Sequence, residues 1–560
     1  MLPGRHTGSL RSEKARVSAD LHTGAGDRSR AYQLLASLAV TAMLFAFCLA
    51  IFEPFWESND DIGMSMIAHG YGIADTPSAA LIFVNVIMGG VLQILPTING
   101  VLAYSWLLFS IVFLACWALL YFVLRSGGPF ALAAVALAIT AIQLVAAPQF
   151  SIAAGVATSA GVLAWLSHTR SPSMSALIAG ALLLSAGYLV RMHEAVFILV
   201  MALPFVPWSR LRIGLPEILT ATLTVGFVLI ATVTEQLYYQ GPGWAAFYAF
   251  EPVRVPLTDY GLADHILKHP SLMEAHGFSR NDIRLIAHWF FFDPALAAPD
   301  RLSALFASLP PRNALFDNAP MAWQAVKGLF DPAMAPLTIA AIALTAFSRA
   351  RMRAIMAWAI FVIIIAAFGW AGRPAVLHVY MPAPILIMFV CLERGLMAQA
   401  VQPMWRVFPL TVLLVALIAM LRVYVAHNIE LQARSELARA DMAKLDPDAH
   451  YVVWGAGFPA EVAWPALAPV DKIARFRQYG LGWESLAPFA LQTFESTPWR
   501  DLTDRFARDE DIPVITHSAN LPMLSTYCRE HHNGTLSARE EPFQTFTVFH
   551  VTCGAQANKK

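Results

Sequence analysis

The sequence has little charge, no charge imbalance and few cysteines. Charged residues make up 14% of its 560 positions, whereas soluble domains contain about 25%. This deficit excludes an ordinary soluble protein, and the formal net charge of zero gives no basis for nucleic-acid binding. None of the five cysteines has the spacing of a zinc site. The sequence also lacks a Gly-Lys-Ser phosphate loop, a Gly-x-Ser-x-Gly elbow and a His-Glu-x-x-His motif.

What the sequence does contain is a series of long apolar runs in a chain that is 57% hydrophobic. Such runs predict a mainly α, polytopic bundle of transmembrane helices, with about eleven spans. The apolar segment 79–95 is short and is interrupted by Asn85, Gly89 and Gln93, so we interpret it as an interfacial helix. If it crossed the membrane, every later loop would be inverted. The predicted spans are 31–52, 99–124, 129–147, 151–167, 174–190, 195–208, 216–238, 333–348, 354–371, 375–392 and 407–426.

The positions of the arginines give this bundle an orientation. With eleven spans, most arginine clusters fall in loops on the side of the N-terminus, which the positive-inside rule places in the cytoplasm. The N-terminus lacks the pattern of a cleavable signal peptide, because its first apolar run is long enough to span a bilayer. We therefore expect a cytoplasmic basic tail (1–30), a transmembrane domain (31–426) with outer loops 53–98 and 239–332, and an extracytoplasmic domain (427–560).

The last 130 or so residues indicate a small α/β domain. Residues 451–454, 512–515 and 546–551 are predicted strands, with helical patterns between them. Cys528 and Cys553 lie in this region and would be able to pair outside the cytoplasm; two free buried thiols are the alternative.

Polar residues gather where the predicted outer ends of the spans lie. Glu57, Asp60 and Asp61 directly follow the first span, and burying such charges in hydrocarbon costs several kcal/mol. They would therefore face water, a partner or a substrate. The structural alternative is that Asn59 caps a helix whose dipole Asp60 and Asp61 complement.

Basic residues are expected at the same face. Arginine suits phosphate because it offers a fixed fork of donors. Each arginine also has a structural interpretation: Arg191 would pair with Glu194, Arg373 would extend to lipid headgroups, and Arg254 would lie on the surface. The predicted basic set is Arg191, His193, Arg254 and Arg373, with His378 nearby.

This arrangement resembles the GT-C superfamily of polytopic glycosyltransferases. The resemblance rests on an acidic motif after the first span, interfacial segments behind it and a long later outer loop. The residues that carry it are Glu57-Ser58-Asn59-Asp60-Asp61, Gly70-Tyr71-Gly72, Pro77, the 85–93 helix, 277–282, Trp289 and Asp293.

The resemblance implies a bacterial inner-membrane enzyme that uses a polyprenyl-phosphate-linked sugar donor and a glycan or lipid acceptor of the cell envelope, with inversion. Asp60 or Asp61, with Glu57 next, would be the general base, and the basic set would hold the donor phosphate. No cofactor is required, although some members use a divalent metal such as Mg²⁺ or Mn²⁺. Many members carry an acidic pair in a second outer loop, where this chain offers only Gln149, so metal dependence is in question.

Two other classes compete with an enzyme. A flippase or transporter of lipid-linked sugars would carry ionisable groups at mid-membrane, whereas here the polar residues gather at the outer ends of the spans. A non-catalytic membrane scaffold would use the C-terminal domain to bind a partner. The sequence favours the glycosyltransferase.

Overall fold

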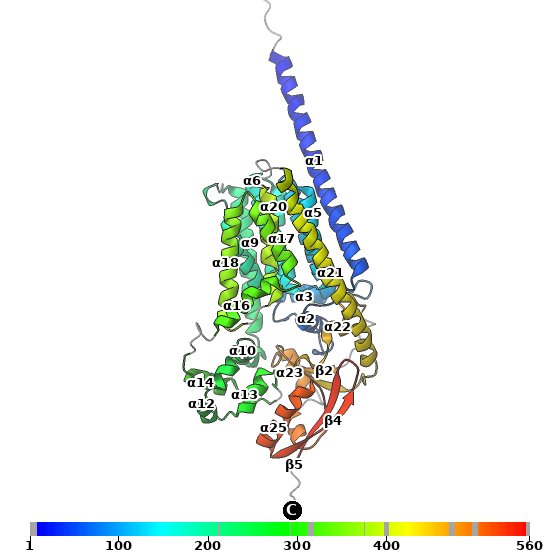
Figure 1. Cartoon of the computed structure of the whole chain (residues 1–560), viewed down its shortest axis with the longest axis vertical. Helices are drawn as coiled ribbons and strands as arrows, with labels where there is room; N and C mark the ends of the chain where they lie inside the picture. The colour runs from blue at the N-terminus through cyan, green and yellow to red at the C-terminus, as the bar shows by residue number, and fades with distance from the viewer. Residues whose placement is uncertain are drawn as a thin grey trace, which may run out of the picture.

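The helices form a bundle with two smaller parts below it (Figure 1). The computed structural model describes residues 8–210, 213–291, 293–311, 318–373, 376–396, 403–469, 477–495 and 502–555. The chain is mainly helical, as predicted. The bundle helices are α1 (Gly8–Ile51), α4 (Ala103–Arg125), α5 (Phe130–Ala146), α6 (Phe150–Arg170), α7 (Met174–Val190), α8 (Met192–Ala202), α9 (Leu215–Tyr239), α17 (Ala335–Phe347), α18 (Arg351–Trp370), α20 (Pro382–Arg394) and α21 (Pro403–Met442).

The number of spans differs from the prediction. Seven of the described helices are long and apolar enough to cross a membrane, and a bent pair, α16 (Ala319–Lys327) with η3 (Gly328–Phe330) and then α17, would be an eighth. Three further predicted spans coincide with apolar helices of at most 17 residues, fewer than the ~20 that a ~30 Å hydrocarbon core requires. The prediction of eleven spans rested on the charges in the loops, and these charges carry no information about helix length. Either count makes the chain an integral membrane protein.

The centre of the bundle is α6, which the other helices surround. In its apolar stretch 94% of the residues are buried, compared with 6% in α9 at the edge of the bundle. Small residues allow close packing between α6 and α7, since a Cβ at Gly187 would overlap the side chain of Thr158.

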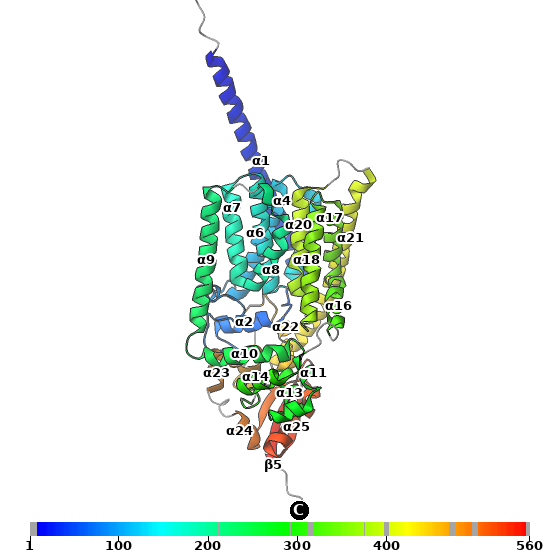
Figure 2. The same ribbon diagram turned by 90° about the vertical axis from the view of Figure 1, so that its left-hand side faces the viewer.

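Short helices lie across the lower end of the bundle (Figure 2). α2 (Asn59–His69) and α3 (Val86–Ile94) follow α1, and α3 has only nine residues, which agrees with an interfacial helix. Asn85 caps α3 by accepting a hydrogen bond from the backbone N–H of Ile87. The outer region after α9 contains α10 (Trp244–Thr258), α11 (Leu262–Ile266), α12 (Pro270–Ala275), α13 (Arg280–Ala287) and α14 (Pro299–Ser308).

The C-terminal domain is built on a mixed five-stranded sheet of order β2-β1-β3-β5-β4. The strands β1, β2 and β3 are parallel, and β5 is antiparallel to β3 and β4. The three predicted strands are confirmed as β1, β3 and β5. The prediction missed β2, which contains a glycine, and β4, which is polar and at the sheet edge. The strands are β1 (His450–Trp454), β2 (Arg477–Leu481), β3 (Ile512–Ile515), β4 (Gly534–Pro542) and β5 (Thr547–Ala555).

The helices of this domain include α22 (Ala460–Ala463), α23 (Pro488–Glu495), α24 (Leu502–Ala507) and α25 (Leu521–His532). A disulfide joins Cys528 of α25 to Cys553 of β5, which decides the alternative that the sequence left open. Cys48, Cys116 and Cys391 are free and buried.

α21 connects the bundle to the C-terminal domain. It has 40 residues and continues past the lower end of the bundle, so the predicted boundary at 427 falls inside this helix. Asn428 fixes it to the end of α1: its side chain donates to the Glu53 carbonyl (2.7 Å) and accepts from the Glu53 N–H (3.2 Å). Arg439 adds an ion pair with Glu53 (3.5 Å).

Candidate active site

The acidic stretch begins α2, which lies between the bundle and the C-terminal domain (Figures 1 and 2). The N-cap is Ser58, whose side chain makes no capping hydrogen bond, and Asn59 is already the first helical residue. The interpretation of Asn59 as a cap is therefore wrong. The helix ends at Gly70, whose φ of 68° is the left-handed conformation that glycine adopts most easily.

Asp61 is fully buried and fixes α2 to the bundle. The Tyr104 hydroxyl at the start of α4 donates to it (2.8 Å), as does the backbone N–H of Phe150 at the start of α6 (3.1 Å). Ser58 donates to its other oxygen (3.3 Å). Burial raises the pKa of the Asp61 carboxyl well above its ordinary value. Both oxygens of Asp61 are thus occupied by protein donors, which hold α2 against the start of α4 and α6.

Glu57 is also engaged. Its carboxylate lies 2.7 Å from Nδ1 of His378, which belongs to the short helix α19 (Leu377–Tyr380). Its backbone N–H donates to the Pro148 carbonyl (3.2 Å), so the acidic loop is held against the turn between α5 and α6.

Asp60 is the acid of this stretch whose side chain has no hydrogen bond or ion pair to any residue that the structure describes. It is half-buried. Burial raises the pKa of its carboxyl, whereas the charges of His378 and Arg191 lower it. Glu57 and Asp259 raise it further. Asp60 is thus a partly desolvated carboxylate beside a histidine and an arginine, free to accept a proton.

Two of the predicted arginines lie with Asp60. Arg191, in the turn between α7 and α8, donates to the Ser151 hydroxyl (2.7 Å), and its guanidinium lies 4.6 Å from the centre of the Phe150 ring. It interacts electrostatically with Glu194, but the two form no ion pair. Its other charged neighbours include Asp60 and Arg373.

Arg373 approaches from the end of α18. Its guanidinium lies 5.7 Å from the centre of the Tyr260 ring and donates to the Tyr260 hydroxyl (3.4 Å). His193 is exposed, and both Arg191 and Arg373 act on it electrostatically. Asp60, Arg191, His193 and Arg373 therefore form one mixed-charge group at the lower end of the bundle.

Arg254 does not join this group. Its side chain is buried in α10, where its guanidinium pairs with Glu251 (2.6 Å) and lies 4.9 Å from the centre of the Trp289 ring. The prediction of a surface residue is wrong, and a fully paired guanidinium has little left to offer a phosphate.

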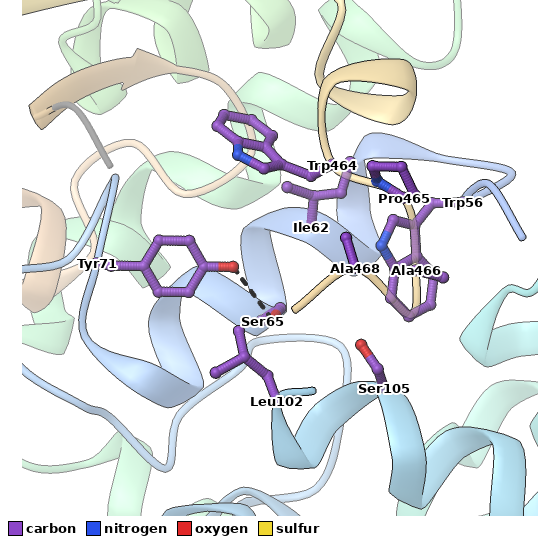
Figure 3. A pocket seen from close by; sticks show the side chains of 10 residues that line it. All are labelled: Trp56, Ile62, Ser65, Tyr71, Leu102, Ser105, Trp464, Pro465, Ala466 and Ala468. Carbon is purple, nitrogen blue, oxygen red and sulfur yellow. Dashed lines mark hydrogen bonds between the residues drawn. The ribbon is translucent and has the colours of Figure 1, made fainter. Parts of the chain in front are cut away.

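Two cavities border α2. The first, of about 10 Å³, lies between α2, the start of α4 and residues 464–468 of the C-terminal domain (Figure 3). A water molecule needs about 10–15 Å³, so this cavity has room for one water at most. In Figure 3 the Tyr71 hydroxyl points to Ser65 (3.4 Å), and Trp464 and Trp56 close the other side. This is a packing interface.

The second cavity is larger, about 90 Å³, and lies between α2 and the sheet. It includes Glu484, which is 7% exposed. Burial raises the pKa of this carboxyl to about 7, with Asp60 adding to the effect and Arg254 opposing it. The prediction missed Glu484, whose only sequence signal is its place just after Gly480-Leu481-Gly482.

Comparisons with known proteins give little further information about this site. No family model matches the chain, and no curated protein matches it. Among solved structures, the crystal structure of ArnT from Cupriavidus metallidurans in the apo state aligns with 92% of this chain and 97% of its own, at 13% identity and a TM-score of 0.36. Similarity at this level is too low to assign a function, which therefore has to come from the residues of this chain.

Proposed function

We propose that this protein is an integral membrane glycosyltransferase of the GT-C type. It transfers a sugar from a polyprenyl-phosphate-linked donor to a glycan or lipid acceptor of the cell envelope. The observation that carries the proposal is Asp60, an acid without a direct partner among the described residues, beside Arg191 at the end of a lipid-embedded bundle. A site of this kind suits a substrate with a phosphate head and a lipid tail.

In the proposed reaction Asp60 is the general base. It takes the proton of an acceptor hydroxyl while that oxygen bonds to the anomeric carbon, and the bond from this carbon to the phosphate oxygen breaks. Attack opposite the leaving group inverts the configuration. Partial burial of Asp60 makes it a stronger base than an exposed carboxylate, which favours proton transfer near neutral pH.

Arg191 and Arg373 would hold the polyprenyl phosphate that leaves. Its negative charge grows as the bond breaks, and guanidinium groups fixed beforehand stabilise that charge without reorganising. Phe150 and Ser151 fix Arg191, and Tyr260 fixes Arg373. His193, exposed next to both, would contact the same phosphate at the rim.

The acids fit a bound metal poorly. The carboxylate of Asp61 accepts three hydrogen bonds from protein donors, and that of Glu57 contacts His378. Of the three acids only Asp60 remains to bind a cation, so a Mg²⁺ ion, which proteins usually hold through one or two carboxylates and substrate phosphates, would have a single carboxylate from this stretch, and that carboxylate is the proposed base. We therefore assign the charge stabilisation to the arginines and expect transfer to continue in the presence of EDTA.

We also propose that the site faces away from the cytoplasm. The acidic loop, the outer region after α9 and the C-terminal domain share one end of the bundle (Figure 1). Arginines such as Arg170 and Arg394, which both pair with Glu393, lie in the loops predicted to face the cytoplasm. The disulfide in the C-terminal domain suits an oxidising compartment.

The test compares Asp60→Asn with Asp61→Asn in purified protein. The assay follows release of polyprenyl phosphate from a polyprenyl-phosphate-linked sugar by mass spectrometry, with a cell-envelope extract as acceptor. We expect Asp60→Asn to lower the rate by about 10²–10⁴-fold, the usual contribution of a general base. Asp61→Asn should change it less than tenfold, because an amide oxygen still accepts from Tyr104 and Phe150. An unchanged rate in Asp60→Asn would show that another residue is the base.

A further inference from the structure

The larger cavity lies on the face of α2 that the bundle does not use. Asn59, Ile62, Gly63 and Met66 line it, and their spacing of three and four residues places them on one side of a helix. Asp61 points to the bundle instead. Asn59 directly precedes Asp60, and the charge of Asp60 acts on Glu484 in the wall of this cavity, so the cavity lies close to the proposed base.

The opposite wall is the carboxyl end of the parallel strands. Val453 and Gly455 lie at the end of β1, and Gly480 and Leu481 at the end of β2. The chain passes from β1 to β2 on one side and then back to β3 on the other side of β1. Ligands of open α/β sheets bind at such a reversal, outside the carboxyl ends of the strands.

Glu484 gives this cavity a polar group built into its wall. The carboxylate is more than nine-tenths buried, its own backbone N–H donates a hydrogen bond to it, and no described residue forms an ion pair with it. A Cβ at Gly480 or Gly482 would overlap its oxygens, so the two glycines make the space that it occupies. A buried carboxylate without an ion-pair partner costs stability, and such a group is a candidate for acting on a ligand.

The chemistry of the lining limits what can bind. Among the described residues that line it there is no lysine, arginine or histidine, and the nearby Arg254 is already paired with Glu251, so an anionic group such as a phosphate would find no basic side chain in the wall to bind it. Phe458, Trp464 and Trp483 provide aromatic surface, and Asn59 and Gln478 provide amide groups. At about 10–15 Å³ for each water, about 90 Å³ holds about six to nine waters, which is the space of one small polar molecule.

We infer that this cavity binds an uncharged, hydroxyl-rich sugar unit of the acceptor, with Glu484 hydrogen-bonded to its hydroxyl groups. That the bound sugar belongs to the acceptor rests on the proposed glycosyl transfer. The cavity itself and the class of ligand that it binds do not depend on that proposal. The C-terminal domain thereby supplies the acceptor subsite, while Arg191 and Arg373 of the bundle supply the donor-phosphate subsite.

Packing connects the two subsites. The ring of Trp483 contacts α2 at Gly63, where an added Cβ would lie 2.7 Å from the ring. The same ring packs against Phe83, with 4.7 Å between the two ring centres. Phe83 stacks on Phe150 (5.9 Å between ring centres), over which Arg191 lies. The wall of the sugar cavity and the phosphate-binding arginine are therefore held by one continuous row of contacts.

The test is carbodiimide footprinting of the full-length protein in detergent. Dicyclohexylcarbodiimide reacts with protonated carboxyl groups, so a buried carboxyl whose pKa is about 7 should be labelled near pH 6.5. Peptide mass spectrometry reads labelling at Glu484, and the exposed Glu540 of β4 reports the background labelling of an exposed carboxylate. The probes are methyl α- and β-glycosides of glucose, galactose, mannose and N-acetylglucosamine. They are used at about 1–50 mM, because a binding free energy of about −4 kcal/mol corresponds to a Kd of about 1 mM. Inorganic phosphate and undecaprenyl phosphate are the comparison probes.

We expect at least one methyl glycoside to lower labelling at Glu484 by fivefold or more and to leave Glu540 unchanged. Trp483→Phe, which keeps an aromatic ring against α2, should weaken that protection severalfold while Glu484 stays labelled. Equal protection by inorganic phosphate or undecaprenyl phosphate would contradict the inference, as would the absence of protection by every glycoside. This result is independent of the Asp60→Asn rates, so a failed sugar subsite is distinguishable from a failed glycosyltransferase.

Discussion

Replacing Glu484 with glutamine should stabilise the C-terminal domain, and more so at high pH. The folded protein raises the pKa of this carboxyl from 4.5 to about 7. Since each pKa unit corresponds to ~1.36 kcal/mol, ionised Glu484 costs the folded state about 3 kcal/mol. A group with a raised folded pKa gives its full stabilisation below its unfolded pKa and loses it as pH rises through the folded value. The cost should therefore appear between pH 4.5 and about pH 7.

The assay is thermal unfolding of purified protein between pH 5 and pH 8, followed by intrinsic tryptophan fluorescence. At pH 5 the free energies of unfolding of the variant and the native protein should differ by less than about 1 kcal/mol, because Glu484 is protonated in the folded protein. At pH 8 the variant should melt several degrees higher. Glu540→Gln, an exposed change on β4, is the matched control and should show no such trend. A Tm difference for Glu484→Gln that stays constant from pH 5 to pH 8 would refute the reasoning.

Three further predictions concern other contacts. Replacing Cys528 and Cys553 with serine opens a loop of 25 residues, which should cost about 3.5 kcal/mol of stability and lower the Tm of the C-terminal domain; an unchanged Tm would show that the pair contributes nothing. The hydrogen bond to Asp282 raises the pKa of His531, so the contact between α25 and α13 should weaken as the pH rises through this raised pKa. Hydrogen exchange in α13 measures the weakening, and His531→Gln should abolish its pH dependence. Arg373→Ala should raise the KM for the donor at least tenfold with little change in Tm, whereas an unchanged KM would remove Arg373 from the phosphate site.

The sequence predicted the regular elements well because their signals are local. Apolar runs marked the bundle helices, and short apolar runs with β-branched residues marked β1, β3 and β5. Helix length was harder, since charge placement and span length are separate properties: α8 has only 11 residues where a span was predicted. The strand β4 was invisible because an edge strand can be polar on both faces.

The site was predictable only in part, because burial and pairing depend on distant residues. The acidic stretch was identified, yet only the fold separates Asp61, which Tyr104 holds, from Asp60, which lacks such a partner in the described chain. Arg254 fits the same sequence criteria as Arg191, but Glu251 pairs with it. Glu484 lies more than 400 residues from Asp60 in the sequence, and only tertiary structure brings it to α2.

The length of α21 sets the rotation of the sheet relative to the bundle. Its 40 residues extend about 60 Å, and a ~30 Å hydrocarbon core accounts for only half of this. Each residue added to or removed from such a helix turns everything beyond it by about 100°. Natural variants of this architecture should therefore change the projecting part of α21 in whole turns, near seven residues at a time. Such a step would restore the direction of the sugar cavity but move it about 10 Å further from the lipid, so it would also require a longer acidic loop or a longer acceptor.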